Sequence, residues 1–517
     1  MKKQKAEYYS SINYIKQKNS GKAKGGFPLY IDNEEKIFDT SDSHTLTIGA
    51  PGSFKSRAVV YSLVLSCMSA KKSMVIHDCK GEIFTWIKAE LEANDYCVKI
   101  VDFRNPIYCQ SDFSLFSLPA RNYQEGKIDD AVIEVQNIFD ILCREVDSQE
   151  DPYWNVTARQ FLTGIFLMAC ELNYTPEEMS FSLFYKILLD GMTKSGGKTY
   201  FETYLELFDN RLLEEHLYPT INTASDTQAC ILSFVAAILA RYSTQSSIND
   251  ILSGEPFDVN SFLARPSALF LVTRDESTTY SPLYGAIINI LYERLLLAKT
   301  NNAKLWEVAF ILDEFALIHN VPDMPEKVAA ARSRGIRFHL VIQALPQLSA
   351  LYGQDDAANI LACCQVMLYL YSPDMTTNRY ISERIGLRQG EFVLPPNDLS
   401  NLEEGVGLIF YRRDKPFFTR FLDKDDYKRA YGGELKAQKD QKESHQKRNL
   451  RDVPDSRIKD TVDSLKREHM SKISKLLESQ KDKEKAEIAW EMAKTRAKID
   501  LKEYQIRHLR TEGENNQ

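Results

Sequence analysis

The sequence predicts an α/β fold: a doubly wound, mostly parallel sheet with a helical domain inserted into it. Three observations predict this. Short apolar runs alternate with helical stretches, a glycine-rich loop follows the first run, and the alternation stops between about residues 110 and 262. Almost wholly apolar runs are typical of parallel strands that are covered on both faces. Their alternation with helices is typical of a doubly wound sheet.

Eight short runs of β-branched or other apolar residues, bounded by turn residues, are the candidate strands. They are Thr45–Ile48, Met74–Ile76, Val98–Val101, Ala268–Val272, Val308–Leu312, Phe338–Ile342, Val366–Leu370 and Leu408–Tyr411. Helical stretches such as Ser56–Ser69 and Lys327–Arg334 separate several of them.

The middle of the chain has a different pattern. Ile128–Glu145, Asn155–Leu172 and Ser225–Arg241 carry apolar residues at three- and four-residue spacing, which is typical of amphipathic helices. We therefore expect an all-α domain over residues 110–262. It would interrupt a nucleotide-binding domain formed by residues 45–109 and 263–432.

Composition limits the classes of protein and partner. A length of 517 residues suggests two or three domains of roughly 150 residues each. The net charge of −7 gives no overall attraction to DNA or to anionic membranes, so a nucleic acid would need local basic surfaces. The nine cysteines are scattered without CxxC pairs and the histidines show no ligand spacing, which predicts reduced thiols and no structural zinc.

Both ends of the chain are charged. Residues 1–44 begin with a basic, polar segment, Lys2–Lys24, and no run of about 18 apolar residues predicts a membrane-spanning helix. Residues 433–517 hold 21 basic against 17 acidic side chains. A broken heptad-like stripe in this tail predicts a solvated helix or loose coiled coil, with a nucleic-acid arm as the alternative. The stripe consists of Ile458, Val462, Leu465, Ile473 and Leu476.

A candidate phosphate-binding loop lies between the first strand and the first helix. It consists of Gly49, Ala50, Pro51, Gly52, Ser53, Phe54, Lys55, Ser56 and Arg57. In such loops backbone N–H groups surround a phosphate, the lysine reaches the β- and γ-phosphates, and the hydroxyl joins the Mg²⁺ shell. Phe54 stands where glycine is usual, so we expect its side chain to crowd the loop and to alter nucleotide affinity or turnover.

Two carboxylates end a later apolar strand. Asp313 and Glu314 follow Val308–Leu312, and a carboxylate at such a strand end can hold Mg²⁺ through water. Glu314 is then placed to polarise an attacking water. An acidic strand end that only caps a loop is the alternative, and the pairing of these residues with Lys55 and Ser56 argues against it.

Further polar residues follow this pair. Arg332, Arg334 and Arg337 come within 24 residues of it, and Gln343 ends the next strand. An arginine offered to a neighbouring subunit's γ-phosphate would stabilise the transition state, and a strand-end glutamine can sense that phosphate. Each arginine taken alone equally fits a solvated or ion-paired surface position.

An ordered series of motifs between about Thr45 and Asp423 resembles the TraG-type coupling proteins of conjugative type IV secretion systems. The motifs are Ile311–Ile318, Arg332–Arg337, Val341–Leu348, Asp78–Glu82, Asp151–Trp154, Thr376–Thr377 before Ile381–Gly386, and Leu394–Asp398. The resemblance implies a RecA-like P-loop NTPase domain with an inserted all-α domain. It also implies ATP and Mg²⁺ as cofactors and a hexameric ring that moves relaxase-bound single-stranded DNA toward a membrane channel.

The resemblance also implies roles for single residues. Lys55 and Ser56 bind phosphate and Mg²⁺, Asp313 and Glu314 serve the metal and the water, Arg332 is the arginine finger acting in trans, and Gln343 senses the nucleotide. Asp78, Lys80 and Glu82 are expected near the nucleotide or a subunit interface, and the all-α domain is expected to meet the relaxosome.

Family members usually begin with transmembrane helices, whereas about 44 residues precede the first strand here. We therefore expect a cytoplasmic chain that an anchoring protein recruits to the membrane and to the channel ATPases. The basic Lys2–Lys24 segment could engage that anchor or could only solubilise the chain. Two other functions stay open: a docking adaptor that binds nucleotide without turnover, and a general DNA translocase.

Overall fold

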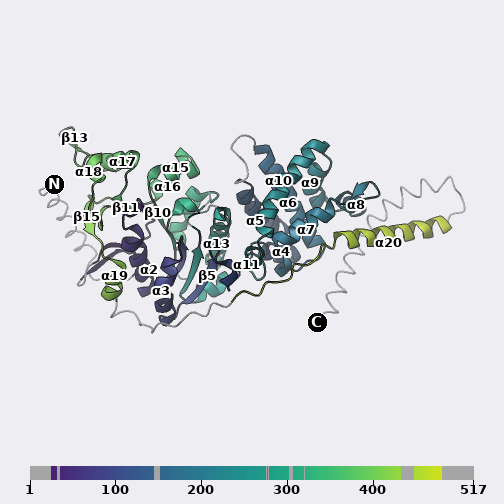
Figure 1. Cartoon of the computed structure of the whole chain (residues 1–517), viewed down its shortest axis with the longest axis horizontal. Helices are drawn as coiled ribbons and strands as arrows, with labels where there is room; N and C mark the ends of the chain where they lie inside the picture. The colour runs from purple at the N-terminus through teal and green to yellow at the C-terminus, as the bar shows by residue number, and fades with distance from the viewer. Residues whose placement is uncertain are drawn as a thin grey trace. The chain divides into compact units, whose positions relative to one another are not determined.

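The computed structural model describes residues 25–31, 35–144, 152–274, 276, 279–301, 307–318, 321–431 and 447–479. The chain forms two compact units, named here the sheet unit (residues 1–111 and 258–447) and the helical unit (residues 112–257 and 448–517) (Figure 1). The basic segment Lys2–Lys24 and the tail beyond Ser479 lie outside the described residues.

A nine-stranded sheet is the centre of the sheet unit, in the order β15-β14-β11-β3-β10-β9-β4-β8-β5. Its strands are β3 (Thr45–Gly49), β4 (Ser73–Asp78), β5 (Cys97–Asp102), β8 (Ser267–Val272), β9 (Val308–Leu312), β10 (Ile336–Ile342), β11 (Val366–Tyr371), β14 (Val406–Tyr411) and β15 (Phe417–Arg420). The seven strands from β11 to β5 are parallel, and β14 and β15 add an antiparallel edge. All eight predicted strands are confirmed, whereas β15 was not predicted.

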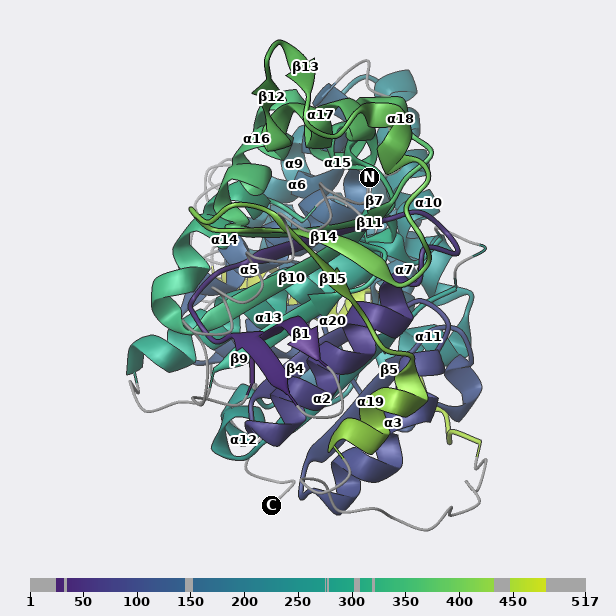
Figure 2. The same cartoon turned by 90° about the vertical axis from the view of Figure 1, so that its left-hand side faces the viewer.

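Helices cover both faces of this sheet, which explains why most of its strands are almost wholly apolar. The helices are α2 (Tyr61–Ser69), α3 (Glu82–Ala93), α12 (Val259–Ala264), α13 (Ser281–Asn301), α14 (Met324–Ala331), α15 (Leu345–Tyr352), α16 (Gln354–Cys363), α17 (Met375–Ile385), α18 (Pro396–Leu399) and α19 (Lys424–Tyr431). Helices α2, α3 and α19 share one buried cluster with alternate strand residues such as Ile76 and Ile311 (Figure 2). The intervening His77 meets Tyr284 of α13 on the other face, with ring centroids 5.8 Å apart.

Part of the segment expected to be only a basic N-terminal extension is folded. Strands β1 (Phe27–Ile31) and β2 (Lys36–Asp39) form an antiparallel hairpin. Phe27, Leu29 and Ile37 are buried in a cluster with side chains of β11, β14 and β15. Two further short hairpins are β12 (Leu387–Arg388) with β13 (Glu391–Phe392), and β6 (Lys194–Ser195) with β7 (Lys198–Thr199) in the helical unit.

Within its described residues, the helical unit consists mainly of helices, with that small hairpin and one isolated bridge between Ser114 and Pro256 as its strand pairing. Its helices are α4 (Ser117–Gln124), α5 (Ile128–Cys143), α6 (Pro152–Glu171), α7 (Phe181–Gly191), α8 (Tyr200–Leu207), α9 (Arg211–Ile221), α10 (Ser225–Ser243), α11 (Ser246–Ile251) and α20 (Ile458–Ser479). Helices α5, α6 and α10 occupy the three predicted helical stretches. All residues of α6 from Phe161 to Cys170 are buried. A helix that is buried on all sides lies in the interior of its domain, so α6 is the central helix of this unit.

A C-terminal strap, residues 448–457, runs along the helical unit before α20 begins. The buried Arg448 forms ion pairs with Asp112 and Asp250, and the Arg451 guanidinium donates to the Asp250 carbonyl at 2.8 Å. Further along, the Arg457 guanidinium lies 4.3 Å from the Tyr174 ring centroid. The strap therefore joins the start and the end of the inserted sequence through one buried charge cluster.

Helix α20 corrects the expectation of a solvated helix or loose coiled coil. Its first turns bury Ile458, Val462 and Leu465, and the helix packs on α7 and α8 of the same unit. The apolar stripe is therefore, over these three residues, a packing face within the helical unit.

Membrane-spanning potential is low throughout the part of the chain that the structure describes. No single helix there is both long and apolar enough to cross a bilayer. The pair α9 and α10 meets the criterion only when taken together across a bend of 113°.

The buried strap contacts give a stability prediction. Arg448→Ala leaves Asp250, whose side chain is 4% exposed, without its buried partner. We expect a loss of about 3–5 kcal/mol of unfolding free energy from the helical unit. Urea unfolding followed by hydrogen exchange on α10 and α11 measures it. Arg451→Ala is the matched control, because its side chain is 41% exposed and it should lose much less. Equal losses in the two variants would contradict the account.

Candidate functional site

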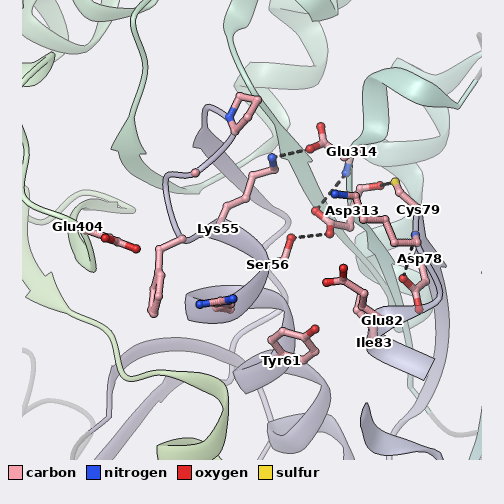
Figure 3. A pocket seen from close by; sticks show the side chains of 15 residues that line it. Lys55, Ser56, Tyr61, Asp78, Cys79, Glu82, Ile83, Asp313, Glu314 and Glu404 are labelled. Atoms are coloured by element: carbon pink, nitrogen blue, oxygen red, sulfur yellow. Dashed lines mark hydrogen bonds and ion pairs between the residues drawn. The ribbon is translucent and has the colours of Figure 1, made fainter. Parts of the chain in front are cut away.

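A cavity of about 510 Å³ opens at the edge of the sheet where its parallel strands end (Figure 3). The loops after β3, β4 and β9 meet there, as ligand-binding loops do in open α/β sheets. The lining residues are Pro51, Gly52, Phe54, Lys55, Ser56, Arg57, Tyr61, Asp78, Cys79, Lys80, Glu82, Ile83, Asp313, Glu314 and Glu404. The two predicted halves of the site are therefore brought together.

The loop after β3 has the tight geometry that a phosphate cradle requires. The Ser53 N–H donates to the Ala50 carbonyl at 3.0 Å. A Cβ on Gly49 would lie 2.3 Å from the Ser53 hydroxyl oxygen, so any larger residue there would displace the Ser53 side chain. That hydroxyl is buried and has no hydrogen-bond partner among the described residues. The loop thus offers an unpaired polar group beside its backbone.

Phe54 adopts the backbone conformation of the glycine that it replaces. Its φ is 73°, in the left-handed region that L-residues avoid. Its partly buried side chain packs against the cluster that contains Phe27, Leu370 and Phe421. The loop accommodates the Phe54 side chain in two ways: its backbone takes a strained conformation, and the ring packs against this cluster. The expected effect on nucleotide affinity or turnover stays a prediction.

The chain turns directly from this loop into a helix. Residues Ser56–Val60 form one wide π-helical turn, η1, which continues into α2. Such turns are uncommon and are often found at functional sites. Lys55 and Ser56 stand at the N-terminal end of this helix, where backbone N–H groups and the helix dipole favour an anion.

Ser56 and Asp313 connect the two halves of the site. The Ser56 hydroxyl donates to the Asp313 carboxylate at 2.7 Å. Burial raises the pKa of Asp313 to about 6, the Ser56 hydrogen bond opposes that rise, and the neighbouring Glu314 carboxylate adds to it. A hydroxyl and a carboxylate in contact at this place are suitable oxygen donors for Mg²⁺.

Glu314 lies between Lys55 and Gln343. Its carboxylate forms an ion pair with the buried Lys55 ammonium and accepts a hydrogen bond from the Gln343 amide at 3.0 Å. Its backbone has a φ of 50°, again left-handed. Strained residues of this kind are concentrated at functional sites. Gln343 is thus placed where it contacts the carboxylate expected to act on water.

Two side chains at the end of β4 hold the Asp313 backbone. A His77 ring nitrogen contacts the Asp313 carbonyl, and the Cys79 thiol donates to the same carbonyl at 3.5 Å. Burial lowers the pKa of His77 to about 4, so its imidazole is neutral at pH 7. These contacts fix the strand end without adding charge to the cavity.

The loop after β4 is organised by Asp78. Its carboxylate accepts hydrogen bonds from the Phe84 N–H at 2.8 Å and the Lys80 N–H at 3.4 Å. Lys80 and Glu82 line the cavity, and Figure 3 shows the Glu82 carboxylate near Tyr61 and Asp78. The sequence motif is thus placed beside the candidate nucleotide pocket, with Asp78 in a positioning role.

Arg332 lies away from this cavity. It belongs to a short turn, η5 (Arg332–Arg334), that precedes β10, whereas Gln343 follows β10. The seven residues of β10 span about 20 Å. Arg332 therefore stands at the opposite edge of the sheet, where it pairs with Asp42 at 2.7 Å.

Four lining residues were not predicted from the sequence: Tyr61, Cys79, Ile83 and Glu404. Tyr61 lies one helical turn after Arg57, so helical spacing could have identified it. Glu404 precedes β14, and no local pattern connects it with a loop some 350 residues earlier. Only the pairing of β14 with β11 brings it to this edge.

Residues 1–389 match the family described as type IV secretory system conjugative DNA transfer. The chain belongs to this family. It is 25% identical over 251 residues to the coupling protein TraD of Escherichia coli (strain K12). The matched region covers 47% of this chain and 32% of TraD. It is 24% identical over 372 residues to the conjugal transfer protein TraG of Escherichia coli, which covers 66% of this chain and 55% of TraG.

The chain therefore spans about a third and about half of the lengths of these two curated relatives. Among solved structures it is similar to the bacterial conjugative coupling protein TrwBdeltaN70. The TM-score is 0.56 at 18% identity, over 80% of this chain and 91% of that one. This likeness confirms the expected RecA-like α/β fold.

The buried Asp313 gives a pH prediction for the chain without metal or nucleotide. Because its folded pKa is raised, the stability it allows is present below the ordinary carboxyl pKa and is lost as the pH rises through about 6. Asp313→Asn cannot ionise, so it should be more stable than wild type at pH 8, by on the order of 1–3 kcal/mol. Urea unfolding at several pH values checks this, and the gain should vanish near pH 4. A gain that is independent of pH would refute it.

Proposed function

We propose that this chain is an ATP-hydrolysing coupling protein of conjugation, with ATP and Mg²⁺ as its cofactors. One observation carries the proposal: three segments that are separate in sequence meet at one cavity. Lys55, Ser56, Asp313 and Glu314 line it, and Gln343 donates a hydrogen bond to Glu314. A basic group, a hydroxyl, two carboxylates and an amide in this arrangement fit phosphoryl transfer to water.

Each side chain has a distinct task in that reaction. The Lys55 ammonium neutralises β- and γ-phosphate oxygens, and the loop amides from Gly49 to Ser56 hold the phosphates. Glu314 orients the attacking water and accepts its proton, and Gln343 holds that carboxylate in place. When phosphate takes over Lys55, Glu314 is released toward the water.

The residues present fit a divalent cation and a nucleotide. Ser56 and Asp313 would hold Mg²⁺, which supplies positive charge at the phosphate oxygens. Gly52 and Lys55 line the cavity beside the N-terminal end of the η1–α2 helix, where backbone N–H groups fit a phosphate. Structures of TrwB exist with an ATP analogue and with ADP and Mg²⁺. Those complexes support the same cofactors here.

We further propose that relaxase-bound single-stranded DNA is the cargo and that a type IV secretion channel receives it. Membership of the conjugative DNA transfer family supports this assignment. The helical unit is the proposed contact for the relaxase complex.

Arg332 is proposed to act on the nucleotide of a second copy of the chain. Its distance from Gln343 along β10 excludes its reaching the phosphates of its own cavity. Its ion pair with Asp42 is partly exposed, with side-chain exposures of 48% and 39%, so the pair is weak and exchangeable. In a ring of copies, the edge of the sheet that carries Arg332 in one chain would face the phosphate cavity of the neighbouring chain.

Phosphate release with Mg²⁺ and ATP tests the proposal. Wild type should turn over faster with single-stranded DNA, and Lys55→Ala should lose about 100-fold or more because transition-state charge is no longer neutralised. Lys459→Ala, an exposed lysine of α20, is the control. Tight ATP binding without turnover would instead indicate a docking adaptor, and stimulation only by double-stranded DNA a general translocase.

The same assay separates action in cis from action in trans. Mixing Lys55→Ala with Arg332→Ala should recover turnover, because one intact cavity then meets one intact arginine. Arg334→Ala, in the same short turn, should leave wild-type turnover unchanged. No recovery on mixing two folded variants would contradict the trans role.

A further inference from the structure

We infer that Phe54 forms a base-stacking wall of the proposed nucleotide site, and that it sets affinity for the base rather than for the phosphates. The inference rests on the proposed function and deepens it. It concerns a position where the loop would be simplest with glycine.

The first observation is that Phe54 is kept at a cost. A non-glycine residue at φ 73° is strained by about 1–2 kcal/mol. Glycine would remove that strain, whereas the Phe54 ring offers an aromatic surface that glycine lacks. Gly52, two residues earlier, has a φ of 78° and no such side chain. The comparison shows that the loop can supply glycine where only backbone geometry matters.

The second observation is where the ring lies. It packs against a buried cluster that includes side chains of β11, β14 and β15. In the sheet, β11 lies on the opposite side of β3 from β9 with its Asp313 and Glu314. Phe54 also lines the cavity. The ring therefore has an apolar support and also borders the cavity.

The third observation concerns two charged residues that also line the cavity, Arg57 and Glu404. The Arg57 guanidinium lies 5.9 Å from the ring centroid, and Arg57 directly follows Ser56. Glu404 also lines the cavity, and Figure 3 places it on the other side of Lys55 from Asp313. A carboxylate repels phosphate, so a nucleotide must turn its uncharged part toward Glu404 and its phosphates toward Lys55.

These features together describe a subsite for a flat aromatic group. A base that leaves the phosphates beside Arg57 meets the face of Phe54, and stacking on an aromatic ring accepts every base. The ligand class is thus a nucleoside triphosphate, with no distinction between bases from this wall.

Calorimetric titration with Mg·ATP and, separately, with Mg·tripolyphosphate tests the inference. Tripolyphosphate has the phosphates but lacks the base. Phe54→Leu keeps an apolar, equally strained side chain without an aromatic face, and Phe54→Tyr keeps the face. We expect Phe54→Leu to bind Mg·ATP about 10-fold more weakly and Mg·tripolyphosphate as wild type does. Phe54→Tyr should bind both ligands as wild type does.

Other results have separate meanings. Unchanged ATP affinity in Phe54→Leu, or an equal loss for both ligands, would overturn the stacking role, since the ring would then act only on the loop. Thermal unfolding verifies that each variant is folded, and Phe54→Gly provides a second folded test that should also lose affinity for ATP alone. Wild type that binds neither ligand would defeat the proposed function itself.

Discussion

Burial of the Asp313 carboxylate at the end of β9 is the constraint on which the rest of the site depends. A buried charge is costly unless it is paired or hydrogen-bonded. Here the Ser56 hydroxyl reaches it across the sheet, and Lys55 pairs with the adjacent Glu314. These two contacts tie the loop after β3 to the end of β9, and they keep the phosphate-binding groups positioned for their ligand.

The sheet and much of the site could be predicted because their signals are local. Runs such as Val308–Leu312 are apolar for a simple reason, since both faces of the sheet are covered, and the loop residues around Lys55 follow one another in the chain. Glu404 and the Arg332–Asp42 pair could not be predicted. Their placement depends on strand order, which pairs segments that no short pattern connects.

The ends of the chain show the opposite limit. The hairpin of β1 and β2 alternates apolar and polar residues only briefly, so its charged surroundings hid it. The heptad-like stripe of α20 was real, but its partner is the helical unit of the same chain. A stripe of apolar residues states that a face is covered without stating what covers it. Arg448, whose buried ion pair fixes the strap, lies in a mostly polar stretch of sequence, so nothing in that stretch distinguishes it from exposed arginines.

We propose that the Glu314 carboxylate stays paired with the Lys55 ammonium until a phosphate takes its place. Nucleotide affinity of Glu314→Gln, measured by calorimetry with Mg·ATP alongside single-turnover phosphate release, tests this most directly. We expect Glu314→Gln to bind ATP more tightly than wild type, because Lys55 is no longer paired. We also expect it to lose turnover, because the general base that accepts the proton of water is gone. Weaker binding, or turnover at the wild-type rate, would contradict it.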